Sequence, residues 1–527
     1  MRAEISLKIE YTAAGESRTV EVNAAGDARP AEAVRELGLV TRRAGSTWRV
    51  LATPSRELTV TSVTATLACD VRGAASVFMN GYQSWTDSRE RGVWANMPGL
   101  SHVPGKLVHS YNIDWAGDYR FTREDPLPGH QHGFGYAYLR YANKCLLAGS
   151  LDENSGFTTI REDAFRNTLT FEKEPPATAL AAGEERELMG LYVAEGEELD
   201  ELVEAWLASA GVTPLPAPKL MGYTSWYRHY GDISEEKLLG DFEGLNAVMA
   251  TTPHEGAELL FQVDDGYAKV GDWLRPDEAR FPNGMAPIAA AAHEQGYLAG
   301  IWLAPFICER ESKLAAEHPS WIVSEAAGSN YNWSGACALD ITNPEVREYV
   351  RTCLHTITAE WGYDLLKLDF LFAACMEMRG GLNRGELMAA GVRLIRESVA
   401  PGTRLLFCGI PMTSAFGTCE YCRVGCDVGL DWNDKPHMRL LHRERVSTKN
   451  SLANARGRAH LNGRAFGCDP DVFFLRRDVE LTEEQRTEMH QTDATCGSVL
   501  LTSDDMGAWD AEQLAAYHAL VKHFLAS

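Results

Sequence analysis

The sequence changes its hydrophobic rhythm near residue 210, and that change restricts what the chain can fold into. Before it, apolar and polar residues mostly alternate, as in ISLKIEY and ELTVTSVTATLACDV, which is typical of strands with one buried face. After it, short apolar runs alternate with longer segments of helical period, such as EEKLLGDFEGLNAVMA. This second pattern indicates βα units around a parallel sheet.

We therefore expect two domains joined by a linker. Residues 1–212 are predicted to form an N-terminal antiparallel β-sandwich, and residues 213–219, within the proline-rich GVTPLPAPK, the linker. Residues 220–527 are predicted to form a catalytic (β/α)₈ TIM barrel, an α/β fold. Its expected strands are residues 221–226, 258–265, 297–303, 365–371, 404–409, 422–428, 458–463 and 497–503.

Charge and hydropathy restrict the partners. The formal net charge of −23 disfavours nucleic acid and anionic membrane surfaces. No apolar run is long enough to span a bilayer, and the start of the chain lacks the apolar stretch of a secretory signal. We expect a cytoplasmic protein that binds neither nucleic acid nor membranes. The sequence carries no signal for the oligomeric state.

Three of the twelve cysteines are close together in GTCEYCRVGC, at Cys419, Cys422 and Cys426. Three thiols at this spacing are compatible with zinc or an iron–sulfur cluster. However, structural zinc almost always takes four ligands, and no nearby histidine or second CxxC pair completes the set. We expect buried free thiols, and neither a metal nor a cofactor.

Polar and aromatic residues lie at the carboxyl ends of the predicted barrel strands, where such barrels place their active sites. These residues are Trp226, Tyr227, Asp264, Asp265, Trp302, Lys367, Asp369, Cys408, Arg423 and Asp427. Carboxylates and aromatic rings around one opening suit a sugar: the rings stack on its apolar face and the carboxylates accept its hydroxyl groups.

Glycoside hydrolysis needs two carboxyl groups beside the bond that breaks. Asp369 is the candidate nucleophile, because Lys367 lies on the same strand face and a neighbouring cation lowers a carboxyl pKa. A purely structural ion pair is the alternative. Asp427 is the candidate acid, and we expect Arg423 to point toward the sugar or Asp369 rather than pair tightly with Asp427. Rival acids are Asp431 and Asp434.

Asp264 and Asp265 are adjacent, so both can face one ligand only if the chain bends, which Gly266 permits. We interpret the acidic residues of CDPDVFF (Asp469 and Asp471) and the pair Asp504 and Asp505 as loop caps or outer support of the site. The motifs HExxH, the Walker loop and GxSxG are missing from the sequence, which disfavours the corresponding enzyme classes.

Eight segments, in order from about residue 75 to about residue 505, resemble glycoside hydrolase family 36, the bacterial α-galactosidases and their relatives. They are NGYQSW, GYTSWYRHYGDI, FQVDDGYAKVGDWL, GIWLAPF, KLDFLF, FCGIPM, RVGCDVG and CDPDVFFLR. Many relatives have tryptophan where this chain has Leu368. The chain ends directly after the last expected barrel helix, so we expect the C-terminal β-domain usual in the family to be absent.

The resemblance implies that Asp369 is the nucleophile, that Asp427 is the acid/base, and that Asp264 and Asp265 bind the galactose 4- and 6-hydroxyls. It also implies a sugar pocket lined by Trp226, Tyr227, Trp302, Lys367, Cys408 and Arg423, with Trp85 of NGYQSW closing it from the other domain. Taken alone, NGYQSW is typical of an ordinary hairpin turn.

The predicted function is a retaining exo-α-galactosidase acting on small α-galactosides or oligosaccharides. The same carboxylates would serve an α-galactosyl transglycosylase, and a roomier pocket would suit an α-N-acetylgalactosaminidase. A non-catalytic carbohydrate-binding protein is disfavoured because both carboxylates are present. A metal-dependent enzyme is the least favoured alternative.

Overall fold

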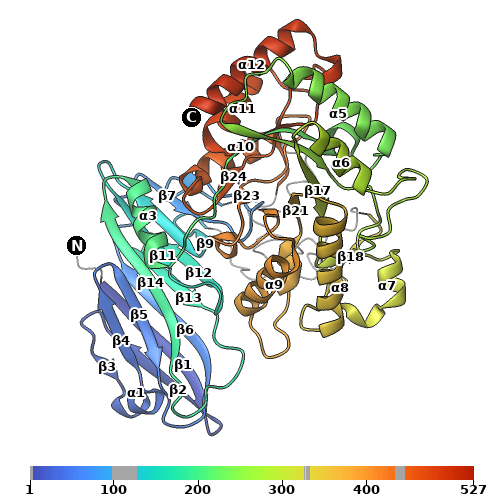
Figure 1. Cartoon of the computed structure of the whole chain (residues 1–527). Coiled ribbons are helices and arrows are strands. Elements are labelled where there is room, and N and C mark those ends of the chain that lie inside the picture. Colours follow the sequence, from blue (N-terminus) through green and yellow to red (C-terminus); the bar gives the residue numbers. More distant parts are fainter. Residues whose placement is uncertain (1–3, 98–126, 326, 328–332, 434–444) are drawn as a thin grey trace.

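The computed structural model describes residues 4–97, 127–325, 327, 333–433 and 445–527. Strands dominate the N-terminal part, and helices surround a curled sheet in the C-terminal part (Figure 1). In the described residues, no helix is both long and apolar enough to cross a membrane.

The N-terminal part consists of two antiparallel seven-stranded sheets. The first has the order β3-β2-β1-β6-β13-β12-β9 and the second β4-β5-β14-β11-β10-β7-β8. Their strands are β1 (Glu4–Ala13), β2 (Glu16–Val22), β3 (Ala28–Arg29), β4 (Val40–Ala44), β5 (Thr47–Ala52), β6 (Thr59–Ala68), β7 (Ser76–Met79), β8 (Glu90–Arg91), β9 (His132–Phe134), β10 (Tyr136–Arg140), β11 (Cys145–Ser150), β12 (Thr158–Asp163), β13 (Thr168–Lys173) and β14 (Arg186–Gly196).

The alternating sequence pattern places one face of these strands in a common core. In β1 the buried residues recur at every second position, including Leu7 and Ile9, because successive side chains of a strand point to opposite faces. Leu7 and Ile9 of the first sheet belong to the same apolar cluster as Val50 (β5) and Leu191 (β14) of the second sheet. The two sheets therefore pack against each other.

The C-terminal part is built on a parallel sheet of nine strands, ordered β24-β23-β22-β21-β17-β16-β15-β26-β25. They are β15 (Lys219–Thr224), β16 (Ala257–Val263), β17 (Leu298–Leu303), β21 (Leu365–Leu368), β22 (Arg404–Phe407), β23 (Tyr421–Arg423), β24 (Gly467–Asp469), β25 (Val472–Phe473) and β26 (Val499–Thr502). The two edge strands, β24 and β25, are separated in the chain by Pro470 and Asp471 alone. This confirms the predicted α/β architecture with a curled parallel sheet and antiparallel sheets.

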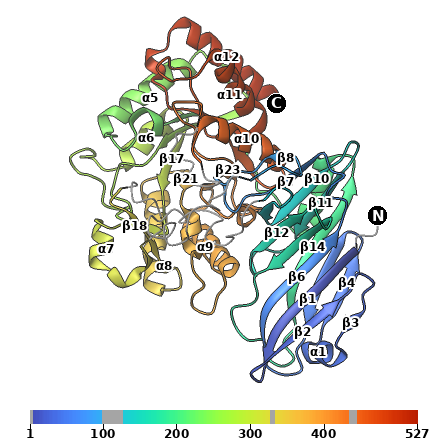
Figure 2. The ribbon, with the colours of Figure 1, turned by 180° about the vertical axis from the view of Figure 1, so that it is seen from behind.

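Most of the helices surround this sheet (Figures 1 and 2), whereas α1 and α3 lie against strands of the N-terminal sheets. The helices are α1 (Ala31–Leu37), α3 (Leu199–Ser209), α4 (Trp226–His229), α5 (Glu235–Met249), α6 (Ala286–Glu294), α7 (Lys313–Glu317), α8 (Pro344–His355), α9 (Arg384–Ser398), α10 (Thr448–Arg458), α11 (Glu483–Cys496) and α12 (Ala511–Ala526). A small antiparallel sheet, β18-β20-β19, contains β18 (Ile307–Glu309), β19 (Ile322–Ser324) and β20 (Ala336–Leu339).

The predicted strand at residues 458–463 is wrong. The helix α10 begins after its N-cap Ser447, whose hydroxyl accepts from the Asn450 amide, and it continues through Arg458. A 3₁₀ turn, Ala459–Leu461, follows. The next strands of the parallel sheet are β24 and β25, which flank Pro470 in the motif CDPDVFF. Proline lacks the amide hydrogen that a continuous strand donates.

The segment between β7 and β8, which contains NGYQSW, contacts the chain that follows β22. The Ser84 amide donates to the Ile410 carbonyl at 3.0 Å, and the Gly409 amide donates to the Ser84 hydroxyl at 2.7 Å. The Met412 amide donates to the Tyr82 carbonyl at 3.1 Å. These bonds place Trp85 beside the carboxyl ends of the parallel strands.

Candidate active site

The paired aspartates follow β16 directly. Asp264 is buried, and its Oδ2 accepts hydrogen bonds from Lys367 Nζ at 2.8 Å, Gln262 Nε2 at 3.2 Å and Thr224 Oγ1 at 3.3 Å. Gly266 has a φ of +117°, so the chain bends where the sequence analysis required a bend. Lys367 forms its ion pair with Asp264, whereas the sequence predicted Asp369 as its partner.

Asp265 has a different environment from its neighbour. It is buried, and its Oδ2 accepts a hydrogen bond from the indole nitrogen of Trp333 at 2.7 Å. Burial raises the pKa of Asp265 to about 7; the charge of Asp264 raises it further, while the Trp333 hydrogen bond opposes the shift. The Asp265 carboxyl group therefore changes charge near neutral pH.

Asp369 lies just beyond the end of β21. Its Oδ2 accepts from the Trp302 indole at 3.2 Å and its Oδ1 from the Phe370 amide at 2.8 Å. Phe370 has a φ of +54°, an uncommon conformation for a large side chain that turns the backbone there. Burial raises the pKa of Asp369, and Lys367 opposes this without overcoming it. The sequence analysis expected a net lowering and left out the cost of burying the carboxylate.

Asp427 lies beyond the end of β23, with 46% of its side chain exposed. Its Oδ1 accepts a hydrogen bond from Arg423 Nη2 at 2.8 Å. The expectation that Arg423 would not pair with Asp427 is therefore wrong. The charge of Asp427 contributes to the raised pKa of Asp369, so the two carboxyl groups interact electrostatically.

The same Arg423 nitrogen also forms an ion pair with Asp471, between β24 and β25. Asp471 Oδ2 accepts from the Tyr227 hydroxyl at 2.6 Å and from the Val428 amide at 2.8 Å. Tyr227 is buried and its hydroxyl is bound to this carboxylate. Tyr227 thus holds Asp471, which shares Arg423 with Asp427.

Four aromatic rings form a chain beside Asp369. The ring centroids of Trp302 and Trp333 are 6.2 Å apart, those of Trp333 and Phe370 5.4 Å, and those of Phe370 and Trp85 5.1 Å. The Trp85 indole donates to the Cys408 sulfur at 3.0 Å. The structure therefore brings Trp85, Cys408 and Trp302 together, as the resemblance implied.

The sequence analysis missed Trp333 because its segment shows neither strand nor helix periodicity. Trp226, which it did select, is half-buried and packs against Tyr230 at 5.3 Å between ring centroids. Of the rival acids, Asp434 lies outside the described residues, and the backbone of Asp431 forms an isolated bridge with Glu480. Cys419, Cys422 and Cys426 are buried free thiols.

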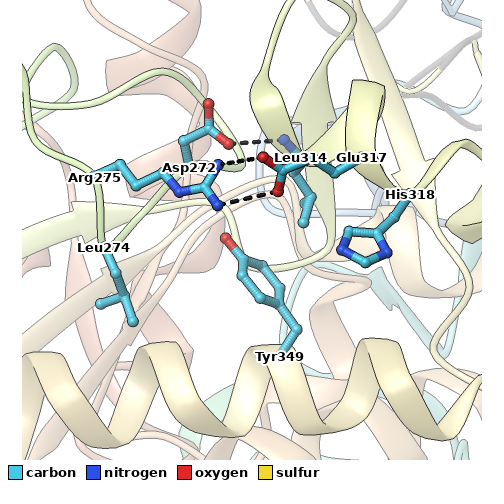
Figure 3. A pocket seen from close by; sticks show the side chains of 7 residues that line it. All are labelled: Asp272, Leu274, Arg275, Leu314, Glu317, His318 and Tyr349. Atoms are coloured by element: carbon cyan, nitrogen blue, oxygen red, sulfur yellow. Dashed lines mark hydrogen bonds and ion pairs between the residues drawn. The ribbon is translucent and has the colours of Figure 1, made fainter.

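A separate cavity of about 140 Å³ lies between α7, α8 and the loop after β16. Figure 3 shows Tyr349 extending from α8 toward the ion pair of Arg275 and Glu317. In this pair, Nη1 lies 3.1 Å from Oε1 and Nη2 lies 3.0 Å from Oε2. Asp272 accepts from the Leu314 amide at the start of α7. None of the predicted site residues lines this cavity.

Comparisons with known proteins find similarity to α-galactosidases. The family model described as Melibiase matches residues 235–376, which include the paired aspartates and Asp369. An α-galactosidase of Escherichia coli is 30% identical over 117 residues, which are 21% of this chain and 16% of the relative. The α-galactosidase Mel36A of Lactobacillus acidophilus is 27% identical over 153 residues, 28% of this chain and 20% of the relative. The matched segments thus span about a fifth of these relatives.

Solved structures match over a greater length. An α-galactosidase from Thermus thermophilus, in complex with p-nitrophenyl α-D-galactopyranoside, superposes with a TM-score of 0.70 at 27% identity, covering 92% of this chain and 94% of that one. The family 36 α-galactosidase AgaA from Geobacillus stearothermophilus, at 13% identity and a TM-score of 0.60, shares the fold over 96% of this chain and 69% of its own. The chain is therefore similar to α-galactosidases in part of its sequence and in its fold.

Proposed function

We propose that the protein is a retaining exo-α-galactosidase that hydrolyses terminal non-reducing α-D-galactosyl residues by double displacement. The observation that carries the proposal is the arrangement of Asp369 and Asp427 at the ends of β21 and β23, beside the aspartate pair after β16. The complexes of the Thermus enzyme with p-nitrophenyl α-D-galactopyranoside and with stachyose support a small galactoside as substrate.

In the first step, Asp369 attacks the anomeric carbon and the bond to the leaving oxygen breaks. Asp427 gives its proton to that oxygen, and a galactosyl ester of Asp369 forms. The Trp302 indole and the Phe370 amide stabilise the Asp369 carboxylate before it attacks. In the second step, Asp427 takes a proton from water as the water oxygen displaces Asp369, and galactose leaves with its original configuration.

Asp264 and Asp265 are proposed to recognise the galactose 4- and 6-hydroxyls, because carboxylate oxygens accept hydrogen bonds from hydroxyl groups. Lys367 neutralises Asp264 in the buried site, where an unpaired carboxylate would be costly. The remaining wall of the sugar pocket would be lined by Trp302, Trp85, Cys408 and Arg423. Tyr227 would instead act through Asp471, to which its hydroxyl donates. No contact among the described residues indicates the roomier pocket that an α-N-acetylgalactosaminidase would need.

We further propose that the parallel sheet closes into a (β/α)₈ barrel whose seventh strand is interrupted at Pro470. The support is that β24 and β25, at opposite edges of the sheet order, are successive pieces of one chain segment. The division at residues 213–219 and the cytoplasmic location stay predictions.

The test is turnover of p-nitrophenyl α-galactoside by the purified chain, with the β-galactoside and α-glucoside as controls and the first product observed by NMR. We expect cleavage of the α-galactoside alone and initial release of α-galactose. Asp369→Ala should abolish turnover, and azide should restore part of it and give β-galactosyl azide. Initial release of β-galactose would contradict retention, and cleavage of another glycoside alone would contradict the substrate assignment.

A further inference from the structure

We propose that Asp471 is a positioning residue for the acid: it shares Arg423 with Asp427, so that Asp427 can hold the proton that it gives to the leaving oxygen. This inference rests on the proposed function, because it concerns the same acid step. Asp471 belongs to the motif CDPDVFF, whose acidic residues the sequence analysis interpreted as caps or outer support.

The geometry places one cation between two carboxylates. Nη2 of Arg423 lies 2.8 Å from Asp427 Oδ1 and is also in contact with Asp471 Oδ2. The Arg423 side chain is only 2% exposed, so water screens its charge weakly. Asp471 is similarly buried, whereas Asp427 faces the open side of the site.

A buried arginine beside a single carboxylate favours the ionised form of that carboxylate. Such a pairing is unsuitable for a general acid, which must stay protonated until the substrate is bound. A second carboxylate on the same arginine offsets this effect, because two negative charges so close to each other repel. The pair Asp427 and Asp471 therefore retains one proton to a higher pH than Asp427 beside Arg423 alone.

Asp471 is held where it can do this. Its Oδ2 accepts from the Tyr227 hydroxyl and from the Val428 amide, and Val428 directly follows Asp427 in the chain. The Asp471 amide donates to Asp469 Oδ1 at 2.9 Å. Asp471 has a φ of +88°, a conformation that is unfavourable for a residue other than glycine. The surrounding contacts keep the side chain there despite that cost.

Other charged and titratable groups act on the same centre, from several elements. They are Asp369 after β21, Asp469 on β24, Lys367 on β21, Cys408 after β22, Cys426 after β23, Tyr227 on α4 and Asp493 on α11. Burial raises the pKa of Asp471 to about 7; Arg423 opposes this shift, and Asp427 and Asp469 add to it. Lys367 also opposes it, but that cation is bound to Asp264.

The first test is the pH profile of kcat/KM for Asp471→Asn. Asparagine tolerates a positive φ and keeps the size of the side chain, so it removes mainly the charge. With phenyl α-galactoside, whose poor leaving group needs protonation, the alkaline limb should move to lower pH by about one unit, a tenfold loss on that limb. With 2,4-dinitrophenyl α-galactoside the change should be much smaller.

Asp504→Asn is the matched control. Asp504 is also buried at a strand end, and its Oδ2 accepts from the Leu475 and Arg476 amides at 2.7 Å, but it makes no ion pair with Arg423. Its alkaline limb should stay at the wild-type position. The proposal is overturned if Asp471→Asn leaves the limb in place, or if it lowers kcat/KM equally for both substrates at every pH.

A second test does not depend on the folding of Asp471→Asn or on turnover. Infrared spectroscopy of the protonated carboxyl band should show Asp265 and the pair Asp427 and Asp471 titrating near neutral pH, and the difference between the spectra of the wild type and Asp427→Asn isolates the titration of the pair. In Asp427→Asn that titration should move to lower pH, because Asp471 then has Arg423 to itself. An unchanged titration overturns the inference. Absence of α-galactosidase activity in the wild-type protein would instead contradict the proposed function, and the infrared result would be unaffected by it.

Discussion

The guanidinium of Arg458 donates two hydrogen bonds to Oδ1 of Asn80, at 3.2 and 3.1 Å, across 378 residues of sequence. Arg458 is fully buried at the end of α10 and also donates to the carbonyls of Ser84 at 2.6 Å and Val424 at 3.1 Å. One side chain thus joins the segment that carries Trp85 to the segment that carries Asp427.

We expect Arg458→Met to reduce both stability and substrate binding. The substitution leaves several buried carbonyl groups without a donor, and each such group costs roughly 1–3 kcal/mol. The free energy of unfolding should fall by about 3 kcal/mol or more. KM for p-nitrophenyl α-galactoside should rise, because Trp85 loses its support. Chemical denaturation and steady-state kinetics measure the two effects.

The control is Arg456→Met, two residues earlier on α10. Arg456 pairs with Glu488 at 2.8 Å on the surface, and such pairs contribute at most about 1 kcal/mol. Equal losses of stability in the two variants would show that the buried contacts of Arg458 carry no special weight.

Asp427→Ala should separate substrates by their leaving groups. Removing a general acid costs about 10²–10⁴-fold when the leaving oxygen needs its proton, as in phenyl α-galactoside. A 2,4-dinitrophenolate leaves without that proton, so its galactoside should lose far less. Asp431→Ala, a carboxylate four residues further along, is the control. If Asp431→Ala shows the stronger leaving-group dependence, the acid has been assigned to the wrong aspartate.

The positions of most parallel strands could be predicted because each is a short apolar run that ends in a polar residue. The segment at residues 458–463 was wrongly predicted as a strand, because the helix α10 runs through Arg458 and the next strands of the parallel sheet are the short β24 and β25 on either side of Pro470. Local periodicity does not encode the helix cap at Ser447 or the contacts that bury an arginine.

The candidate site was predictable only as far as it depends on strand ends. Period two predicts Lys367 on the face of Asp369, but the partner of Lys367 is Asp264, which follows β16, and β17 lies between β16 and β21 in the sheet. The contacts of Trp333 and Arg458 join residues 68 and 378 positions apart. Such pairings depend on the closure of the fold, which a pattern in the sequence does not specify.

Trp333→Phe should change the pH dependence of galactose binding. Burial raises the pKa of Asp265 to about 7, and the Trp333 indole partly opposes this by donating to the ionised form. Galactose hydroxyls donate best to the carboxylate, so affinity should rise as the pH increases through this range. Loss of the indole N–H should raise the Asp265 pKa and move that rise to higher pH.

Calorimetric titration with galactose at several pH values measures this shift. Trp321→Phe is the control, because its indole also donates to a carboxylate, Glu345, at 3.1 Å, away from the paired aspartates. The assignment of Asp265 as the titrating group is contradicted if the wild-type and Trp333→Phe profiles coincide.

Glu162, on β12, should make the protein less stable as the pH rises. It is buried, neither of its carboxyl oxygens has a hydrogen-bond partner among the described residues, and burial raises its pKa to about 8. The unfolded chain releases this proton near the ordinary pKa of glutamate, about 4.3. Between these values the folded state binds more protons, so the free energy of unfolding falls by at most about 1.4 kcal/mol per pH unit. Glu162→Gln cannot ionise, so it should lack this contribution and be more stable than the wild type above about pH 8.

Urea denaturation at pH 5, 7 and 9 measures this difference in stability. The control is Glu172→Gln on the neighbouring strand β13, where Glu172 pairs with Arg161 at 2.5 Å. An equal dependence on pH in the wild type and Glu162→Gln would mean that Glu162 is ionised within the folded protein.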